Sequence, residues 1–514
     1  MTIRALAQRL TKAALPMLAS AAFGASLAPA TPKICASDAG WSSPGEPAPQ
    51  EVREYIGSLG SSFYNQRTAC ARWAGTWSDR RNSRSLSTSG SEGVPGRFIV
   101  YPPQGSDVRQ LAVWLSGSGP VRGIERTHDY LVVSFARRLT GDRLREILFA
   151  PQVGYSEPDC DGPDFMMTSN DLLTTGLPRD CWLRSARSTF PNDPCMDELW
   201  GHASIGWDSR VAARSLPRIV AVLDSGIDAS HEDLKRNVVA RTFTHLHSTT
   251  DRLNARCATS GRCYSHGTEM AGTIGGRMDN GIGVVGVAPN SLMLPIVISS
   301  VDQRQLARLS TIAQGIAEAA RSGADIINIS AKWPVDSRAI SEAILEAVGG
   351  EAAHRRLVIT GYTTTLENDD TVREHFPSRY RCLPGVLAAV PTDMRGRNLS
   401  NPKGRPSATD GRIQAPGVDI VVTTTENSER GYTLSEAAGP SSAAAYVSGS
   451  VALVWGSPPL NKCDAQQIKE LLFCRSKSSA STRYPWINVD FLRELANVDP
   501  ESDCGLAMAA LGCS

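Results

Sequence analysis

The sequence predicts an α/β protein in which a parallel β-sheet is flanked by helices on both faces and is preceded by a small α+β domain. Apolar strand-like runs alternate with helical periodicity over about 280 residues after residue 215, and such alternation is typical of a covered parallel sheet. A shorter alternation precedes it, over residues 97–159. The composition, 41% hydrophobic and 20% charged, excludes wholesale disorder.

The first 30 residues resemble a secretory signal peptide. Arg4, Arg9 and Lys12 form a basic start, residues 13–28 are apolar or small, and Ala28-Pro29-Ala30 fits a cleavage site. A short amphipathic helix of the first domain is the alternative interpretation. We therefore expect a secreted protein, extracellular or periplasmic, with no membrane association after signal removal because no other stretch of 18 or more apolar residues follows.

Residues 31–94 are rich in Ser, Gly, Arg and Pro and are predicted to form a low-complexity segment. Residues 95–160 are predicted to form the small α+β domain, a split β-α-β unit. Its expected elements are strands over 98–101 and 130–135, one helix carrying Val108, Leu111 and Leu115, and a second carrying Leu144, Ile147 and Leu148. Residues 161–195 follow as a linker.

The main domain is predicted over residues 196–496, and residues 497–514 form a tail. Its expected strands are 218–224, 325–330, 357–360 and 386–390, and its expected helices are 303–321 and a segment carrying Ala444, Val447, Val451 and Val454. The basic and acidic side chains number 53 and 52, so the net charge of +1 gives no global attraction for nucleic acid. We expect a monomer.

The 12 cysteines are the least ordinary feature of the composition. Export would place them in an oxidising compartment, where an even number favours disulfides. Close spacing suggests the local pairs Cys257–Cys263, Cys463–Cys474 and Cys504–Cys513, and leaves the other six without an obvious partner. A zinc site of Cys257, Cys263 and His266 is the less favoured alternative because paired short-spaced ligands are absent.

Three segments place a reactive side chain at the end of a predicted element. Asp224 ends an apolar strand, at the sheet edge where ligands of open α/β sheets bind. His266 opens a helix rich in small residues, and Ser441 lies at the start of an apolar helix. A serine hydroxyl needs a base, and a histidine oriented by a carboxylate can be that base. The backbone N–H of Ser441 could in addition stabilise an oxyanion.

These segments closely resemble the Asp, His and Ser motifs of the subtilisin-like serine proteases. The carrying residues are Ile219–Asp228, His266–Ile274, Ser322–Ser330 and the Ser441 segment, within a match over roughly 190–496. Residues 97–159 are similar to the family's inhibitory propeptide. The resemblance implies peptide-bond hydrolysis through an acyl-enzyme, with catalytic Asp224, His266 and Ser441, a peptide or protein substrate, no catalytic cofactor, and a zymogen whose own propeptide inhibits it.

Several positions depart from the family pattern. Pro440 and Ser442 replace the Thr and Met that flank the family's serine, and Lys332 follows Ser330, which the resemblance makes a substrate-binding residue. Tyr362 stands where the oxyanion asparagine is expected, and Asn368, a few residues on, could serve if the loop is rebuilt. A catalytically impaired homologue that acts as a binding or scaffold protein is therefore the alternative function.

A structural calcium ion is implied by the same resemblance. Asp233 matches a calcium carboxylate, and Met278–Val284 resembles the calcium loop, with Asn280 ligating by its side chain and Met278, Ile282 and Val284 by backbone carbonyls. A plain turn at Asp279-Asn280-Gly281 is the other interpretation.

Two other enzyme classes are excluded. The run Gly281–Gly286 spells a dinucleotide fingerprint but lacks the strand before it and the helix after it. An unrelated α/β hydrolase would need a Gly-x-Ser-x-Gly elbow at Ser441 and a different order of triad residues.

Overall fold

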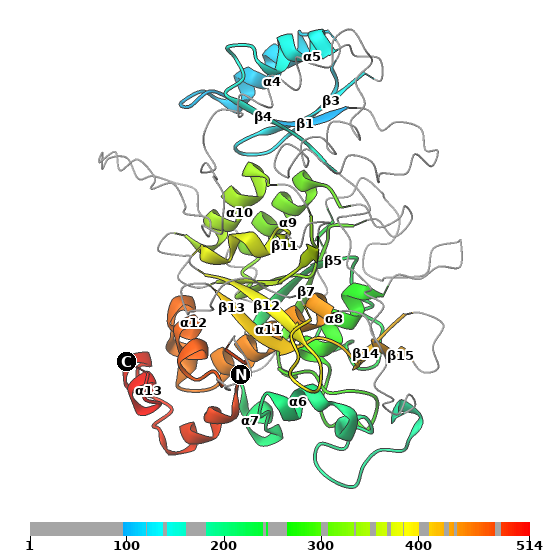
Figure 1. Ribbon diagram of the computed structural model, residues 1–514, viewed down its shortest axis with the longest axis vertical. Coiled ribbons are helices and arrows are strands. Elements are labelled where there is room, and N and C mark those ends of the chain that lie inside the picture. Colours follow the sequence, from blue (N-terminus) through cyan, green and yellow to red (C-terminus); the bar gives the residue numbers. More distant parts are fainter. Residues whose placement is uncertain are drawn as a thin grey trace.

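The computed structural model describes residues 96–119, 121–136, 141–160, 181–239, 243–244, 265–299, 307–333, 336–349, 356–366, 372–383, 385–399, 411–425, 431–435, 439–477 and 485–513. In Figure 1 a small blue and cyan domain lies above a larger layered one. The predicted signal peptide, the 31–94 segment, most of the predicted linker and Asn368 lie outside the described residues.

The small domain is an antiparallel sheet covered on its outer face by two helices (Figure 1). The strand order is β2-β3-β1-β4, and the two predicted strands and two predicted helices are confirmed. Sequence reasoning missed β2 and β4. The elements are β1 (Arg97–Tyr101), α4 (Val108–Ser116), β2 (Val121–Arg126), β3 (Leu131–Phe135), α5 (Gly141–Leu148) and β4 (Tyr155–Pro158).

A seven-stranded sheet of order β13-β12-β9-β8-β5-β7-β6 forms the middle layer of the large domain, and all its neighbouring strands are parallel. This confirms the predicted fold class. The strands are β5 (Ile219–Asp224), β6 (Phe243–Thr244), β7 (Leu292–Val297), β8 (Ile326–Ile329), β9 (Leu357–Gly361), β12 (Val386–Thr392) and β13 (Arg412–Pro416).

Helices cover both faces of this sheet. The side chains of β5 alternate between the two faces, so each face carries apolar residues that a layer of helices must cover. Val220 and Val222 pack on the side of α8 (His266–Gly275) and α11 (Gly439–Gly456). Ala221 and Leu223 pack on the side of α9 (Leu309–Arg321) and α10 (Arg338–Val348), and the apolar core of the small domain joins this second cluster.

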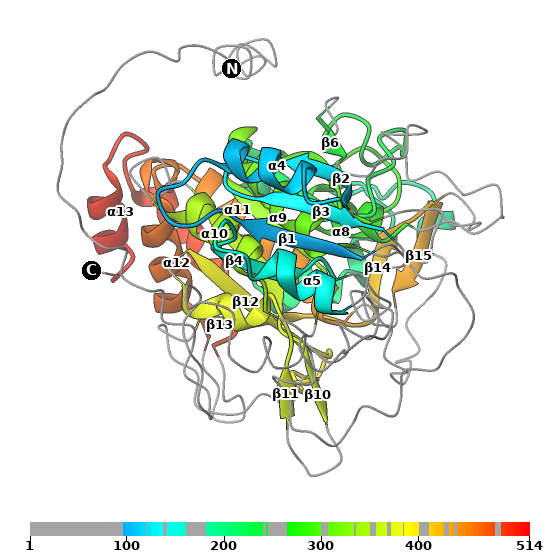
Figure 2. The ribbon, with the colours of Figure 1, turned by 90° about the horizontal axis from the view of Figure 1, so that it is seen from above.

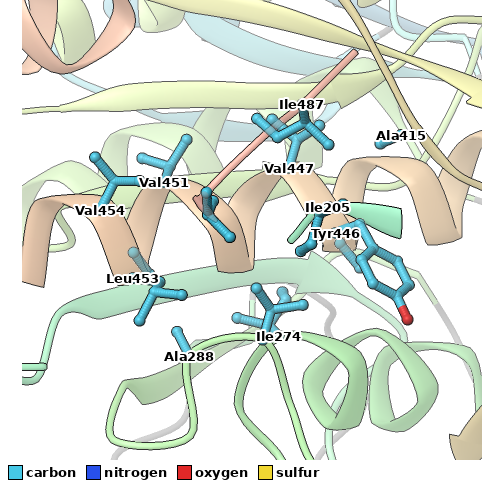
Figure 3. Packing of buried hydrophobic residues seen from close by; sticks show 14 of the residues in the cluster. Ile205, Ile274, Ala288, Ala415, Tyr446, Val447, Val451, Leu453, Val454 and Ile487 are labelled. Atoms are coloured by element: carbon cyan, nitrogen blue, oxygen red, sulfur yellow. The ribbon is translucent and has the colours of Figure 1, made fainter. Parts of the chain in front are cut away.

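Helix α11 is buried around its whole circumference, and Pro440 is its one residue that is not buried. Figure 3 shows its side chains Val447, Val451 and Leu453 among Ile274 of α8 and Ile487. A helix that is apolar all round is stable only in the interior. Its position between the sheet and α8 therefore fixes where its first turn, with Ser441, must lie.

The remaining elements surround this core. Figure 2 shows the hairpin of β10 and β11 projecting from one end. These remaining elements are η2 (Cys181–Leu183), η3 (Met196–Glu198), α6 (Trp200–Ser204), α7 (Ser209–Arg214), β10 (Thr364–Leu366), β11 (Val372–Glu374), η4 (Ser378–Cys382), β14 (Ile420–Thr423), β15 (Tyr432–Ser435), η7 (Leu460–Lys462), α12 (Ala465–Cys474), η8 (Asp490–Asn497) and α13 (Cys504–Ala510). Within the described ranges, no helix combines the length and the apolarity needed to cross a membrane.

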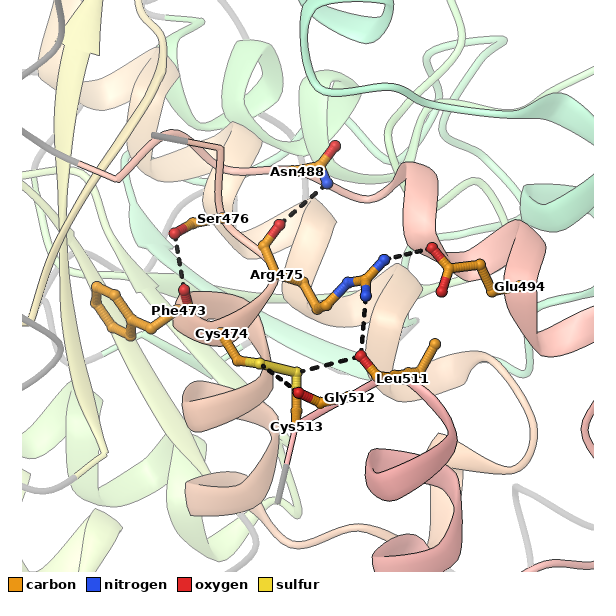
Figure 4. The surroundings of a disulfide bond; sticks show 9 residues. All are labelled: Phe473, Cys474, Arg475, Ser476, Asn488, Glu494, Leu511, Gly512 and Cys513. Carbon is orange, nitrogen blue, oxygen red and sulfur yellow. Dashed lines mark hydrogen bonds and ion pairs between the residues drawn. A yellow bond between two sulfur atoms is a disulfide. The ribbon is translucent and has the colours of Figure 1, made fainter. Parts of the chain in front are cut away.

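Two of the predicted disulfides are wrong. The bonds are Cys463–Cys504 and Cys474–Cys513, the second of which Figure 4 shows beside the Arg475–Glu494 ion pair. Helix α12 separates Cys463 from Cys474 by about 15 Å, since a helix rises 1.5 Å per residue, whereas bonded cysteines have Cα atoms 4.4 to 6.8 Å apart. Helix α13 separates Cys504 from Cys513 in the same way.

A third disulfide joins Cys181 to Cys195, two residues for which the sequence suggested no partner. Cys257 and Cys263 lie outside the described residues. In the described part of the chain, no group of three or more His, Cys, Asp or Glu side chains is arranged to hold a metal ion.

Candidate active site

Asp224 and His266 form a buried hydrogen-bonded pair. The His266 Nδ1 atom lies 2.9 Å from Asp224 Oδ2 and 3.1 Å from Oδ1. The backbone N–H of Ser225 donates to the same carboxylate at 2.7 Å and helps to hold it. A carboxylate at Nδ1 favours the histidine tautomer that carries its proton there, in which Nε2 is the proton acceptor of the ring.

The strand end and the helix start meet closely because Gly267 has no side chain. A Cβ atom at this position would lie 2.2 Å from the Gly226 carbonyl oxygen and 3.1 Å from the Asp224 Cβ atom. The first turn of α8 is also tied to its neighbours, since Thr268 Oγ1 accepts the Asp228 N–H at 2.9 Å. Small residues in the helix start thus allow the histidine to reach the aspartate.

Ser441 lies in the first turn of α11, against the residue that follows β8. Its hydroxyl donates to the Ser330 carbonyl at 3.3 Å, and the Ser330 hydroxyl donates to the Ser441 carbonyl at 3.4 Å. Gly361, at the end of β9, touches the same helix turn, since a Cβ there would lie 2.6 Å from the Pro440 carbonyl oxygen. First-turn N–H groups of a helix have no intrahelical acceptor, and the Ser441 N–H is one of these groups.

The strand register brings these groups to one edge of the sheet. Leu223 of β5 is paired with Ile329 of β8, so Asp224 and Ser330, the next residues, lie level on adjacent strands. Adjacent strands are about 5 Å apart. His266 contacts Asp224 and Ser441 contacts Ser330, so the predicted aspartate, histidine and serine converge at this edge.

The protonation of His266 reflects two opposing influences. Burial disfavours the charged imidazolium, but the Asp224 carboxylate outweighs it, and the pKa of His266 is raised above its ordinary value. Glu269, one helical turn on, acts in the same direction. The site therefore stabilises a histidine that has accepted a proton.

Tyr362 directly follows β9 at the same carboxyl edge, and its side chain is directed into the interior. It is fully buried beside Ala388 and Val390, and its hydroxyl accepts a hydrogen bond from Arg412 Nη1 at 3.3 Å. The guanidinium groups of Arg381 and Arg412 lie 5.6 and 5.3 Å from the centre of its ring. The structure thus surrounds the Tyr362 side chain with apolar residues and two arginines of the interior.

Asp233 and Asn280 are in contact, as the resemblance implies for a calcium site. Asn280 Nδ2 donates to Asp233 Oδ1 at 2.6 Å, while Oδ2 accepts the Val284 N–H at 3.0 Å and the Tyr432 hydroxyl at 2.8 Å. The Asn280 Oδ1 atom accepts the Ile282 N–H at 3.1 Å.

This arrangement does not fit a cation. Hydrogen-bond donors, rather than oxygen ligands, face the Asp233 carboxylate, and the Val284 N–H is turned toward it. Burial raises the pKa of Asp233 to about 7, against the lowering effect of these three hydrogen bonds. The Tyr432 ring packs directly on Gly283, where a Cβ would lie 2.1 Å from it.

We therefore expect the thermal unfolding midpoint to change little when calcium is removed by a chelator or added in excess. Tyr432→Phe removes a hydrogen bond to a buried carboxylate, which contributes about 1.5 to 3 kcal/mol, so it should lower the midpoint by several degrees. Differential scanning calorimetry of both proteins with and without chelator measures this. A large chelator-induced drop in the unsubstituted protein would contradict the expectation.

Comparison with known proteins identifies the family. The sequence pattern of the Subtilase family matches residues 218–484. Subtilisin of Bacillus pumilus is 30% identical over 244 residues, which cover 47% of this chain and 77% of that protein. The chain is a subtilase. Fervidolysin of Fervidobacterium pennivorans is 31% identical over 298 residues, 54% of this chain and 40% of that protein, so the subtilase chain spans less than two thirds of that relative.

Solved structures show the same fold. The fervidolysin crystal structure, described as a keratinolytic enzyme related to subtilisin, superposes with a TM-score of 0.57 and 22% identity, covering 79% of this subtilase and 62% of that chain. The epidermin leader peptide processing serine protease of Staphylococcus aureus gives a TM-score of 0.56 and 16% identity, covering 78% and 99%.

Sequence reasoning missed three residues of this subtilase that hold the site or the small domain. Asn328, in the middle of the apolar strand β8, is fully buried and donates to Ser330. Glu157 and Asp159 bind the starts of α10 and α9. Asn328 could have been found, because it is a lone polar residue within a strand of isoleucines. Nothing near Glu157 in the sequence indicates its partner Ser337, which is 180 residues away.

Proposed function

We propose that the subtilase is a secreted serine endopeptidase made as a zymogen. The observation that carries the proposal is the buried Asp224–His266 hydrogen bond at the sheet edge where Ser330 holds Ser441. A carboxylate, an imidazole and a hydroxyl at one edge are the groups that acyl transfer to serine requires. The substrate class is a peptide or protein chain, which needs no complementary net charge on the enzyme.

The proposed cycle uses each group in turn. The Ser441 hydroxyl leaves the Ser330 carbonyl, transfers its proton to His266 Nε2 and attacks the scissile carbonyl carbon. The Ser441 N–H donates to the oxyanion of the tetrahedral intermediate. His266 then protonates the leaving amine, and water hydrolyses the acyl-enzyme by the reverse proton path, while Asp224 keeps the imidazole oriented throughout.

Covalent labelling with a fluorophosphonate probe tests the proposal directly. The activated Ser441 oxygen should displace fluoride from the probe in the processed protein, and Ser441→Ala should abolish the label. Ser442→Ala is the matched control, because Ser442 is the adjacent residue and is fully buried. Labelling that persists in Ser441→Ala would show that Ser441 is not the labelled nucleophile. No Ser441-dependent labelling together with no cleavage of a general protein substrate would favour the impaired homologue instead.

The contacts of the small domain support its role as an inhibitory propeptide. The Glu157 carboxylate accepts from Ser337 Oγ at 2.8 Å and from the Arg338 N–H at 2.9 Å, at the start of α10. The Asp159 carboxylate accepts from the Ser310 N–H at 3.0 Å and Oγ at 2.9 Å, at the start of α9. Carboxylates are favourable at helix N-termini because they meet unpaired N–H groups.

Both helix starts lie at the edge of the sheet that carries the candidate site. Helix α9 follows β7 and α10 follows β8, so each begins at the carboxyl end of a parallel strand. The chain leaves the small domain after Cys160, whose carbonyl accepts the Leu309 N–H at 3.2 Å. Cys160, the last described residue of the small domain, therefore lies on the side of the molecule where Ser441 lies, which suits cleavage near that residue.

Glu157→Ala should weaken docking of the small domain. Loss of a helix cap costs about 1 kcal/mol, and the Arg338 guanidinium, 4.5 Å from the Tyr101 ring centre and 5.2 Å from that of Tyr155, would keep part of the contact. In full-length precursor carrying Ser441→Ala, amide hydrogen exchange in the first turn of α10 should become several-fold faster. Asp107→Ala, which removes the exposed cap of α4 away from this interface, is the control and should leave α10 unchanged.

The pH dependence of hydrolysis should report His266. The base must be neutral to accept the Ser441 proton, and the Asp224 carboxylate raises its pKa despite burial. Activity is thus expected to be full above this pKa and to fall as the pH drops through it, with the midpoint above the ordinary histidine value of about 6.5. A profile of kcat/KM against pH measures this, and an acid midpoint clearly below 6.5 would contradict it.

A further inference from the structure

A continuous chain of buried hydrogen bonds runs from the middle of α11 to its first turn by way of β8. Ser448 Oγ donates to Asn328 Oδ1 at 2.9 Å, Asn328 Nδ2 donates to Ser330 Oγ at 2.9 Å, and Ser330 Oγ donates to the Ser441 carbonyl at 3.4 Å. All four residues are at most 5% exposed.

The direction of this chain is fixed by chemistry. The Ser441 carbonyl can only accept a hydrogen bond, so the Ser330 hydroxyl must donate its proton to it. In its contact with Asn328 the Ser330 oxygen must then accept, and the NH₂ group of that amide is the donor. The Asn328 carbonyl then faces Ser448, which must donate. Each link therefore has one orientation, and the amide of Asn328 is the central element.

These hydrogen bonds join helix α11 to strand β8 and the residue that follows it, at two points of the helix, Ser441 and Ser448. Ser441 and Ser448 are seven residues apart, which places them on the same face of α11. Asn328 is flanked by Ile327 and Ile329, whose side chains point to the other face of the sheet and pack around α9 and α10. A polar side chain in this apolar strand thus locks both the rotation and the axial position of α11 relative to β8.

We propose that Asn328 is a positioning residue for the Ser441 nucleophile. Through Ser330 and Ser448 it holds the first turn of α11 where the Ser441 hydroxyl and N–H face the reacting carbonyl group. The inference rests on the proposed function of Ser441. It predicts a loss of turnover rather than of substrate affinity, because displacement of reacting groups by about 1 Å can cost about 100-fold in rate.

The test compares two buried serines of α11, of which Ser448 belongs to this hydrogen-bond chain and Ser450 does not. Ser448 and Ser450 are both fully buried, but Ser450 Oγ has no hydrogen-bond partner in the described structure. Ser448→Ala should lower kcat by about 10-fold and leave KM within about twofold. Ser450→Ala should change neither. Ser448→Thr, which keeps the hydroxyl, should restore kcat to within about threefold of the original.

Asn328→Ala should lower kcat by about 100-fold, and adding Ser448→Ala to it should cost little more because both act through one chain. All rates are normalised to the fraction labelled by the fluorophosphonate, so misfolded protein does not count. If Asn328→Ala does not fold, the Ser448 and Ser450 pair decides.

The outcomes separate the two proposals. If the unsubstituted protein is not labelled at Ser441, the proposed function fails and takes the positioning role with it. If it is labelled, equal kcat values for Ser448→Ala and Ser450→Ala would overturn the role of Asn328, as would a rise in KM at constant kcat. A kcat loss confined to the Ser448 and Asn328 variants, with rescue by Ser448→Thr, establishes it.

Discussion

Replacing Ser441 with alanine is expected to lower kcat for peptide hydrolysis by about 10⁶-fold, as removal of the nucleophile does in subtilisin. Without the hydroxyl no acyl-enzyme can form, and His266 and Asp224 have no proton to move. The residual rate would come from substrate binding and the Ser441 N–H, which the substitution leaves in place. Steady-state assays on the processed protein measure the loss.

The same variant should remain uncut near residue 160 if the precursor processes itself. Ser442→Ala is again the matched control and should be processed and active. Normal processing of Ser441→Ala, expressed alone in a protease-deficient host, would show that maturation depends on another protease. A kcat loss of only a few-fold would show that Ser441 is not the nucleophile.

Asp224→Asn is expected to lower kcat by about 10⁴-fold, since an amide at Nδ1 favours the wrong imidazole tautomer. The amide is nearly the same size as the carboxylate, so the fold around β5 should persist. The substitution also removes the negative charge that raises the pKa of His266, so the remaining activity should extend to lower pH. A pH profile of kcat measures both effects.

Asp228→Asn is the control for this experiment, because Asp228 lies in the same segment but its carboxylate contacts Ser230 rather than His266. It should retain nearly full activity. Combining Asp224→Asn with Ser441→Ala should be no worse than Ser441→Ala alone, since residues that act as one unit are not additive. An additive double variant would contradict a shared catalytic role.

Strands β5, β8, β9 and β12 of the main sheet could be predicted because they are short apolar runs that are buried on both faces, as in Ile219–Asp224. Strands β6, β7 and β13 of the same sheet were not predicted. β2 of the small domain was missed because its sequence, Val-Arg-Gly-Ile-Glu-Arg, mixes charged residues with apolar ones. Such charges are common on an edge strand, which β2 is. β4 was missed because its four residues end in proline and carry the acidic Glu157.

The positions of the three candidate residues in the fold were predictable because each residue lies in a local motif. Asp224, His266 and Ser441 each end or begin a recognisable element, and the parallel register then brings them to one edge. The orientation of Tyr362 was not predictable, because it depends on Arg412, which is 50 residues away in sequence and adjacent only in the fold. The hydrogen bond from Tyr432 to Asp233, 199 residues apart, is a second such case.

The two carboxy-terminal disulfides connect α12 and α13 at both ends. Cys463, just before α12, is bonded to Cys504, the first residue of α13. Cys474, the last residue of α12, is bonded to Cys513, shortly after the end of α13. The helices must therefore run in the same direction. A single backbone cut between residues 475 and 503 would leave the last segment attached by two covalent bonds. A protein that shares its surroundings with active protease can thus be nicked there without losing its carboxy-terminal helix.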